Sequence, residues 1–283
     1  MRGPLLMLAA TAVLTCMHAT VRHVSDGMHS FEITFFRNLF GLVAILPLAL
    51  RAGIGNLKSR QPGLQLLRSA FGLVAMFTWF YALSVVPIAQ ATALSFTSVI
   101  FGSIGAALLL GERMRLRRWS AVLAGFAGTL VILRPGFGDV DPAALIVVLS
   151  SICWAGALLT VKRLSATDSV VCIVTWNSIL LTVLSLPVAI PVWVTPSTEQ
   201  LLWLSLIGLL ATLGHLAMTG AFKASDATVV FPVDYTRLLW ATVIGYLAFG
   251  EIPDIWTWIG GTIIFASTTY ISYREATLRR ARE

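Results

Sequence analysis

Long runs of apolar residues constrain the fold of this chain more than any other feature of its sequence. Ten such runs can be placed, at residues 4–21, 31–50, 64–86, 88–110, 119–133, 143–161, 170–194, 201–222, 228–249 and 255–273. About 20 apolar residues in a helix cross the hydrocarbon core of a bilayer. Backbone exposed to lipid must satisfy its amides internally, and the shorter alternating pattern of barrel strands does not occur. The sequence therefore predicts an all-α integral membrane protein with ten transmembrane helices.

The composition excludes an ordinary soluble enzyme. Hydrophobic residues make up 57% of the 283 residues and charged residues only 12%, which leaves no room for a soluble domain. The three cysteines, Cys16, Cys153 and Cys172, lie inside apolar runs and indicate neither a disulfide framework nor a zinc site. The chain contains no P-loop, no metalloprotease His-Glu pair and no Gly-x-Ser-x-Gly elbow, so we expect no cofactor, no metal and no catalytic residues.

The basic residues are distributed unequally between the two sides of a ten-span path. One side collects 16 of the 20 Lys and Arg residues, the other side has only Arg22 and Arg134, and Arg37 and Arg237 fall inside spans. Basic loops stay in the cytoplasm, so this asymmetry predicts that both termini are cytoplasmic. The net charge of +7 is thus interpreted as a topology signal. We expect the chain to interact with the lipid bilayer and not with nucleic acid.

The chain resembles itself at a shift of 139 residues. The matching pairs are Asn38 with Asn177, Ala82 with Ala221, Gly111 with Gly250, Glu112 with Glu251 and Trp119 with Trp258. These positions predict two five-helix repeats, at residues 1–138 and 139–283. Because five is odd, the second copy enters the membrane from the opposite side. Inverted repeats of this kind are typical of secondary transporters, whose substrate sites lie between the halves.

Several motifs make the chain similar to a known family. They are Phe35-Phe36-Arg37, Tyr81-Ala82-Leu83 before Pro87, Gly111-Glu112-Arg113, Gly125 with Gly128, Ala221-Phe222 and Gly250-Glu251. With these motifs the chain resembles the EamA-type transporters of the drug/metabolite transporter superfamily. Further segments, His29-Ser30-Phe31-Glu32, Gly214-His215 and Pro253-Asp254, look like bacterial subgroups that take up S-adenosylmethionine or riboflavin. The resemblance implies a multi-pass inner-membrane carrier for a small organic solute.

Asp234 and Arg237 are the most costly polar pair inside an apolar run. They are three residues apart and can share one helix face. An ionisable residue inside the membrane usually faces a partner or water. Two interpretations stay open: a structural ion pair, or direct participation in substrate binding or proton coupling. Pro232 favours a bend at the same depth.

Polar stripes at helical spacing supply further candidates. One carries Thr11, Thr15, His18 and Arg22, a second Gly208, Thr212, His215 and Thr219, and a third Thr92, Ser95, Ser98, Gly102 and Gly105. Small and hydroxyl residues also serve close helix packing. An intramembrane imidazole can be a hydrogen-bonded core residue or a titrating group. We therefore expect His18, Thr92, Ser95 and His215 to bind substrate or couple its transport, with packing as the alternative.

Aromatic and charged residues complete the candidate list. Trp154, Tyr235 and Trp240 lie deep in their runs and can stack on a flat or cationic solute or simply pack. Arg37 is expected to be a structural or snorkelling charge. Glu251 follows an apolar run and is expected to favour the N-terminus of the next helix.

These observations favour a secondary carrier that works by alternating access. Asp234 or a histidine would be the coupling group if protons drive transport. A passive channel and a membrane-embedded enzyme are the alternatives. Rings of charge or a filter motif would favour a channel, and neither occurs in the sequence.

Overall fold

A computed structural model describes residues 2–110, 120, 123–124, 126–128, 130–131, 142–164, 167–224, 233, 236–263 and 265–266. Over these ranges the chain forms helices and turns and no strand. The helices with defined bounds are α1 (Arg2–Ser25), α2 (Ser30–Ala52), η1 (Ile54–Leu57), α3 (Pro62–Val85), α4 (Ile88–Ser95), α5 (Thr97–Leu110), α7 (Pro142–Leu164), α8 (Val170–Ala189), η2 (Ile190–Val192), α9 (Thr198–Ala224) and α11 (Thr236–Phe249). Six of the described helices are long and apolar enough to cross a membrane, which confirms the predicted all-α membrane fold.

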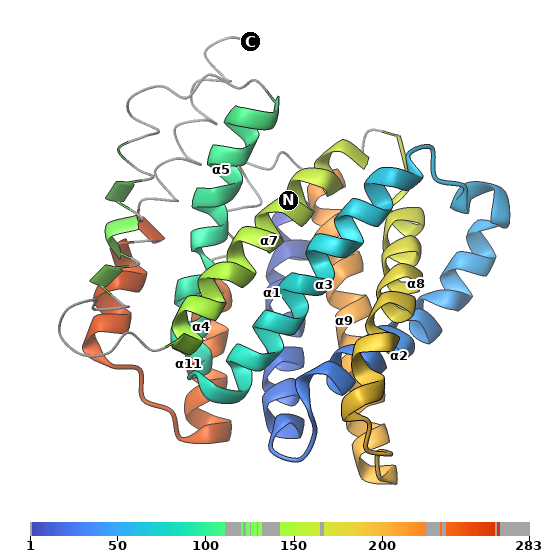
Figure 1. Cartoon of the computed structure of the whole chain (residues 1–283). Helices are drawn as coiled ribbons and strands as arrows, with labels where there is room; N and C mark the ends of the chain where they lie inside the picture. The colour runs from blue at the N-terminus through green and yellow to red at the C-terminus, as the bar shows by residue number, and fades with distance from the viewer. Residues whose placement is uncertain are drawn as a thin grey trace.

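The helices of the two sequence halves pack against each other. α1 packs along α9, α3 packs along α7, and α2 contacts both α8 and α9 (Figure 1). α2 and α9 come especially close, because a Cβ atom added at Gly208 would lie 2.5 Å from the Cβ of Phe40 and 2.7 Å from the backbone nitrogen of Gly41. The Thr212 hydroxyl donates a hydrogen bond to the Gly41 carbonyl over 3.1 Å. Small residues thus allow close contact between these helices.

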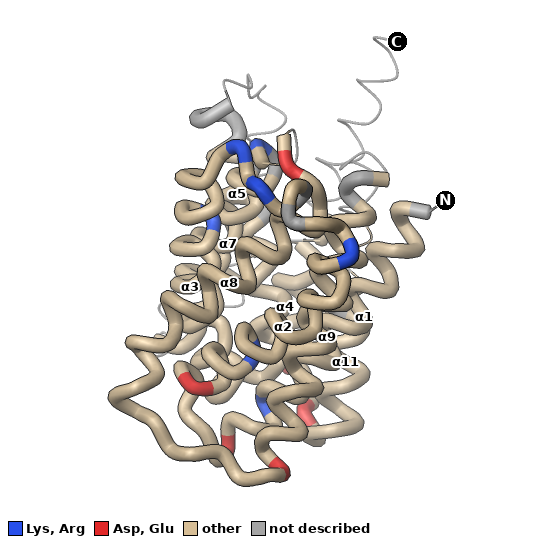
Figure 2. The backbone as a smooth tube through the Cα atoms, turned by 90° about the vertical axis from the view of Figure 1, so that its right-hand side faces the viewer, with Lys and Arg blue, Asp and Glu red and all other residues tan. Residues whose placement is uncertain are grey.

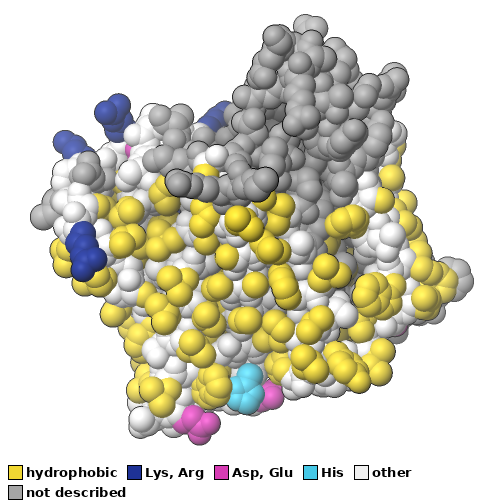
Figure 3. All heavy atoms as spheres, turned by 180° about the vertical axis from the view of Figure 1, so that it is seen from behind, with side chains coloured by type: hydrophobic (Ala, Val, Ile, Leu, Met, Phe, Trp, Pro, Cys, Tyr) yellow, Lys and Arg dark blue, Asp and Glu magenta, His cyan; other side chains and the backbone are white. Residues whose placement is uncertain are grey.

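The surface suits a lipid environment. Apolar side chains cover the face shown in Figure 3, and basic and acidic side chains lie at its upper and lower edges. In Figure 2 most Lys and Arg gather at the upper end of the bundle and most Asp and Glu at the lower end, while a few basic residues lie between. The N-terminus, the end of α2, η1 and the start of α3 lie toward one end, called here the terminal end, and Arg51, Lys58 and Arg60 in and between these segments are exposed. The end of α1 and the start of α9 lie toward the opposite end, and Asp26 and Glu199 there are exposed.

The predicted span 88–110 is interrupted in its middle. α4 ends at Ser95 and α5 begins at Thr97, with Phe96 between them. The Ser95 hydroxyl donates to the Thr92 carbonyl, and the Thr97 hydroxyl donates to the Leu94 carbonyl, each over 2.7 Å. These bonds compete with the helical backbone pattern, which accounts for a tight turn here. α4 and α5 together still fill the predicted span 88–110, because the backbone of Phe96 stays in the right-handed helical region, with φ −66° and ψ −14°.

The core lies toward the opposite end of the bundle. Phe80, Leu83, Val86, Ile88 and Phe96 are at most 2% exposed and belong to one apolar cluster. The cluster joins the turn between α3 and α4 to α1 and α9.

Candidate functional site

A cavity lies inside the helix bundle and receives side chains from both sequence halves. Its walls come from α1, α2, α3 and α4 in the first half and from α7, α9 and α11 in the second half. The space between the lining atoms is about 950 Å³, counting its opening to solvent. The predicted residues that line it are His18, Ser95, Trp154, His215 and Arg237.

Two histidines in the cavity wall each contact a tryptophan. The rings of His18 on α1 and Trp79 on α3 meet edge to face, with centroids 5.3 Å apart. Trp154 on α7 and His215 on α9 have centroids 6.2 Å apart and are tilted by 50°. Such contacts fix ring orientations while leaving aromatic surface toward the cavity. The walls are therefore suited to a flat ring system.

Two arginines bring positive charge to the same cavity. Arg37 on α2 is 5% exposed, and its Nη1 donates to the Asn38 Oδ1 over 2.6 Å. Arg237 on α11 donates to the Ser95 hydroxyl over 3.2 Å, and its guanidinium lies 5.4 Å from the centre of the Phe96 ring. The expectation of a snorkelling Arg37 is wrong, because this side chain is buried inside the bundle and lines the cavity.

Some predicted residues lie away from the cavity. Thr92 is 1% exposed and Trp240 is half-buried, and neither is among the lining residues. The hydroxyl of Thr11 lies 3.0 Å from that of Thr236, so this part of the first polar stripe packs α1 against α11. Asp234 and Tyr235 lie outside the described residues, and the Asp234–Arg237 pair stays a prediction.

Sequence reasoning missed much of the wall. Trp79 and the small or hydroxyl residues Gly72, Ser150 and Ser151 line the cavity, together with four methionines, Met7, Met17, Met76 and Met218. Methionine side chains are flexible and polarizable, so they adapt to solutes of different shape. Helical spacing to recognised site residues was the available signal. Ser151 is three residues from Trp154, and Met218 is three from His215.

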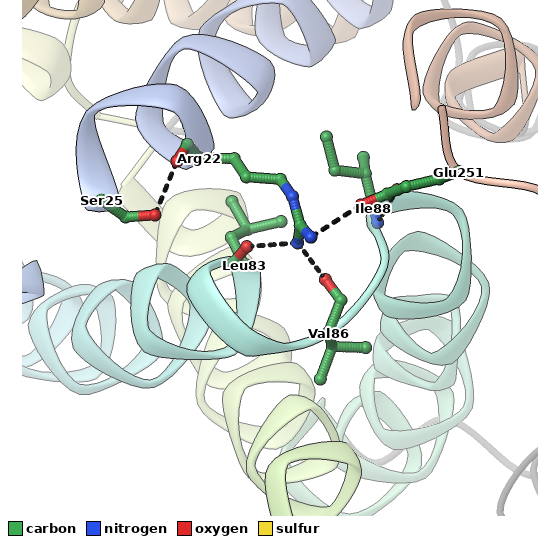
Figure 4. Close-up of polar contacts among 6 residues, drawn as sticks. All are labelled: Arg22, Ser25, Leu83, Val86, Ile88 and Glu251. Atoms are coloured by element: carbon green, nitrogen blue, oxygen red, sulfur yellow. Dashed lines mark hydrogen bonds and ion pairs between the residues drawn. The ribbon is translucent and has the colours of Figure 1, made fainter. Parts of the chain in front are cut away.

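An ion pair closes the opposite end of the bundle (Figure 4). Arg22 on α1 lies 2.8 Å from the Glu251 carboxylate, which follows α11. Arg22 also donates to the carbonyls of Leu83 and Val86, each over 2.7 Å. The other Glu251 oxygen accepts from the backbone N–H of Ile88 over 2.9 Å. We call these contacts the Arg22–Glu251 network.

Glu251 therefore serves a different helix from the one expected. Ile88 is the first residue of α4, so the carboxylate accepts an orphan N–H at the N-terminus of a helix from the first half. The expectation of a contact with the next helix in sequence is wrong, because tertiary packing brings the α3–α4 turn closer. Arg22, one of the two basic residues on the sparsely charged side, is used to join α1, the α3–α4 turn and the second half.

A second network joins the halves at the terminal end. The Asp168 carboxylate, between α7 and α8, accepts hydrogen bonds from the Ser59 hydroxyl, the Arg60 backbone N–H over 3.1 Å and the Gln65 amide over 3.0 Å. Partial burial alone would raise the pKa of Asp168, but the bonds from Ser59, Arg60, Gln65 and Thr167 outweigh it and lower the pKa below its ordinary value. We call these contacts the Asp168 network.

Comparison with known proteins identifies the family. The EamA-like transporter family matches the chain twice, over residues 1–134 and 141–273. The chain belongs to this family. The resemblance seen in the sequence motifs is thus confirmed, and the chain is a multi-pass membrane protein of a transporter family.

Named relatives cover nearly the whole chain. An S-adenosylmethionine uptake transporter of Rickettsia bellii is 32% identical over 90% of this chain and 87% of its own length. A riboflavin transporter of Vibrio cholerae is 34% identical over 97% of this chain and 94% of its own. A pseudopaline exporter of Pseudomonas aeruginosa is 30% identical over 95% of each. One solved crystal structure, 19% identical, has a TM-score of 0.68 over 97% of this chain and 99% of that chain, which supports the fold.

Proposed function

We propose that this protein is a secondary active transporter that moves a small organic metabolite across the bacterial inner membrane by alternating access. The observation that carries the proposal is the cavity, because residues of both sequence halves line it inside the bundle. Transporters of inverted-repeat design bind solutes between their halves. The two separate family matches support repeats at 1–138 and 139–283. The basic terminal end supports cytoplasmic termini.

The solute that fits this cavity contains a flat ring. Trp79, Trp154 and the two histidines line it, and aromatic surfaces favour stacked or edge-on ring partners. The S-adenosylmethionine and riboflavin named for the two relatives each contain a flat heteroaromatic ring, which agrees with such walls. The adaptable methionines would accept related solutes of unequal size.

Protons are the proposed coupling ion. His18 and His215 line the cavity, and an imidazole can gain or lose a proton as its access to water changes sides. Asp234 is the alternative coupling group. Initial uptake rates should therefore respond to an imposed pH gradient. Replacement by glutamine of the histidine that couples transport, His18 or His215, should remove that response while solute exchange persists.

Counterflow in proteoliposomes tests the proposal. Vesicles preloaded with unlabelled S-adenosylmethionine or riboflavin should transiently accumulate the same labelled solute, with saturable kinetics. Trp79→Leu and Trp154→Leu should each lower the initial rate about fivefold, because each removes stacking surface worth on the order of 1 kcal/mol. Trp193→Leu is the matched control, since Trp193 is 41% exposed beyond η2 and away from the cavity. Non-saturating flux would indicate a channel, and chemical conversion of the solute would indicate an enzyme.

A further inference from the structure

A second cavity extends the first toward the terminal end of the bundle. The two share Gly72, Met76, Trp154, Leu158, His215 and Met218, so they adjoin each other along the same side chains. The second cavity adds Arg68, Asn177 and Thr219. Arg68 lies in the second turn of α3, and Thr219 lies in the last third of α9, near the ends of both helices at that side.

Arg68 is the unusual member of this wall. In the sequence, Arg68 is one of the 16 basic residues assigned to the loops of one side. In the structure it is only 8% exposed. No described residue accepts a hydrogen bond from its Nε or Nη1. A buried guanidinium normally has its donors paired, often in a bidentate contact with a carboxylate or phosphate. These donors are therefore available to a group that enters the cavity.

The surroundings of Arg68 increase its preference for an anion. Arg37, a second buried arginine, lines the neighbouring first cavity, so positive charge gathers in this part of the bundle. None of the described residues that line either cavity is Asp or Glu. The amide oxygen of Asn177 lies 3.9 Å from where a Cβ atom of Gly72 would be, which places this amide against the same part of α3. A guanidinium and a side-chain amide together offer several donors to one oxyanion.

From these observations we infer that Arg68, together with Asn177, forms an anion subsite that binds a carboxylate-type group of the transported solute while the ring of the solute lies between Trp79 and Trp154. The inference rests on the proposed function and makes it more specific, since the solute is then an organic anion or zwitterion with a flat ring. An entering carboxylate satisfies the donors of Arg68 and neutralises its buried positive charge. Neutral analogues of the same shape lack this contact.

Cysteine labelling tests the subsite without knowledge of the natural solute. Thr219→Cys is made in a chain whose three native cysteines are replaced by alanine, and it is labelled with neutral methyl methanethiosulfonate in proteoliposomes. Millimolar benzoate should slow the labelling at least fivefold, whereas benzamide, its neutral counterpart, should leave the rate within twofold. Arg68→Gln should abolish the protection by benzoate. Arg68→Lys should retain part of it, because the charge stays and the fork of donors is lost.

Asn177→Ala provides a second variant with the arginine intact. It should weaken the protection by benzoate two- to fivefold. Ser197→Cys, beyond the opposite end of the bundle, is the control for intrinsic reactivity, and benzoate should not change its labelling. The inference is overturned if benzoate and benzamide protect equally, if benzoate protects the Arg68→Gln protein as well as the parent, or if Thr219→Cys does not react. Benzoate protection without counterflow would overturn the carrier and leave the subsite standing.

Discussion

The two ends of the bundle are closed by different chemistry. At the opposite end, Arg22 and Glu251 form an ion pair whose side chains are only 21% and 12% exposed, above a tightly packed apolar cluster. At the terminal end, Asp168 accepts bonds from neutral donors, and the neighbouring cavity extends beside it to Arg68 and Thr219. The comparison shows a charged pair and tight apolar packing at the opposite end, and hydrogen bonds from neutral groups with cavity space nearby toward the terminal end.

Loss of one partner of the ion pair should give the largest effect. Arg22→Met and Glu251→Gln should each lower the free energy of unfolding by about 3 kcal/mol, because each leaves the other member of a largely buried pair without its partner. The double variant should lose clearly less than the sum of the two. Reversible unfolding in mixed micelles measures all three values. Additive losses would show that the two side chains act independently, against the proposed network.

Glycine-to-alanine substitutions along α9 should cost more stability where α9 contacts α2 than nearer the terminal end. Gly208→Ala should cost about 2 kcal/mol, because the new methyl would lie 2.5 Å from the Phe40 Cβ and α2 would have to move. Gly220→Ala, further toward the terminal end, is the matched control. Its methyl would be 3.7 Å from the Leu6 side chain, an ordinary contact, and alanine favours the helix by up to about 1 kcal/mol. Equal losses at both positions would contradict tighter packing of α9 against α2.

The Asp168 network should contribute less than the ion pair. Asp168→Asn should lower the free energy of unfolding by about 1 kcal/mol at pH 7, since it weakens hydrogen bonds to a partly solvated carboxylate. Hydrogen bonding lowers the pKa of Asp168 below 3.8. Its contribution is therefore complete above that pH and lost as the pH falls through the folded-state pKa. Unfolding of both proteins from pH 7 to pH 3 should show a constant difference that shrinks only at the acid end. A difference that grows on acidification would contradict this account.

The architecture could be predicted from the sequence because it depends on the length of apolar runs and on the unequal distribution of basic residues. Both can be recognised without knowing how the helices pack. His18, Ser95, Trp154, His215 and Arg237 could be found as polar or aromatic residues at helical spacing in apolar runs. The proposed role of Arg68 and the contact of Glu251 could not, because the first depends on burial among other helices and the second on a hydrogen bond to another helix. Arg68 resembles a flanking charge, and the partner of Glu251 at Ile88 is 163 residues away.

Alternating access requires that the two ends do not open together, and one labelling rate tests this directly. Thr219→Cys reports access from the terminal end, and Glu251→Gln weakens closure at the opposite end. Opening of the opposite end should close the terminal path, so Glu251→Gln should slow the labelling of Thr219→Cys by methyl methanethiosulfonate several-fold. An unchanged or faster rate would mean that the ends open independently, as in a channel, and would contradict the proposed carrier.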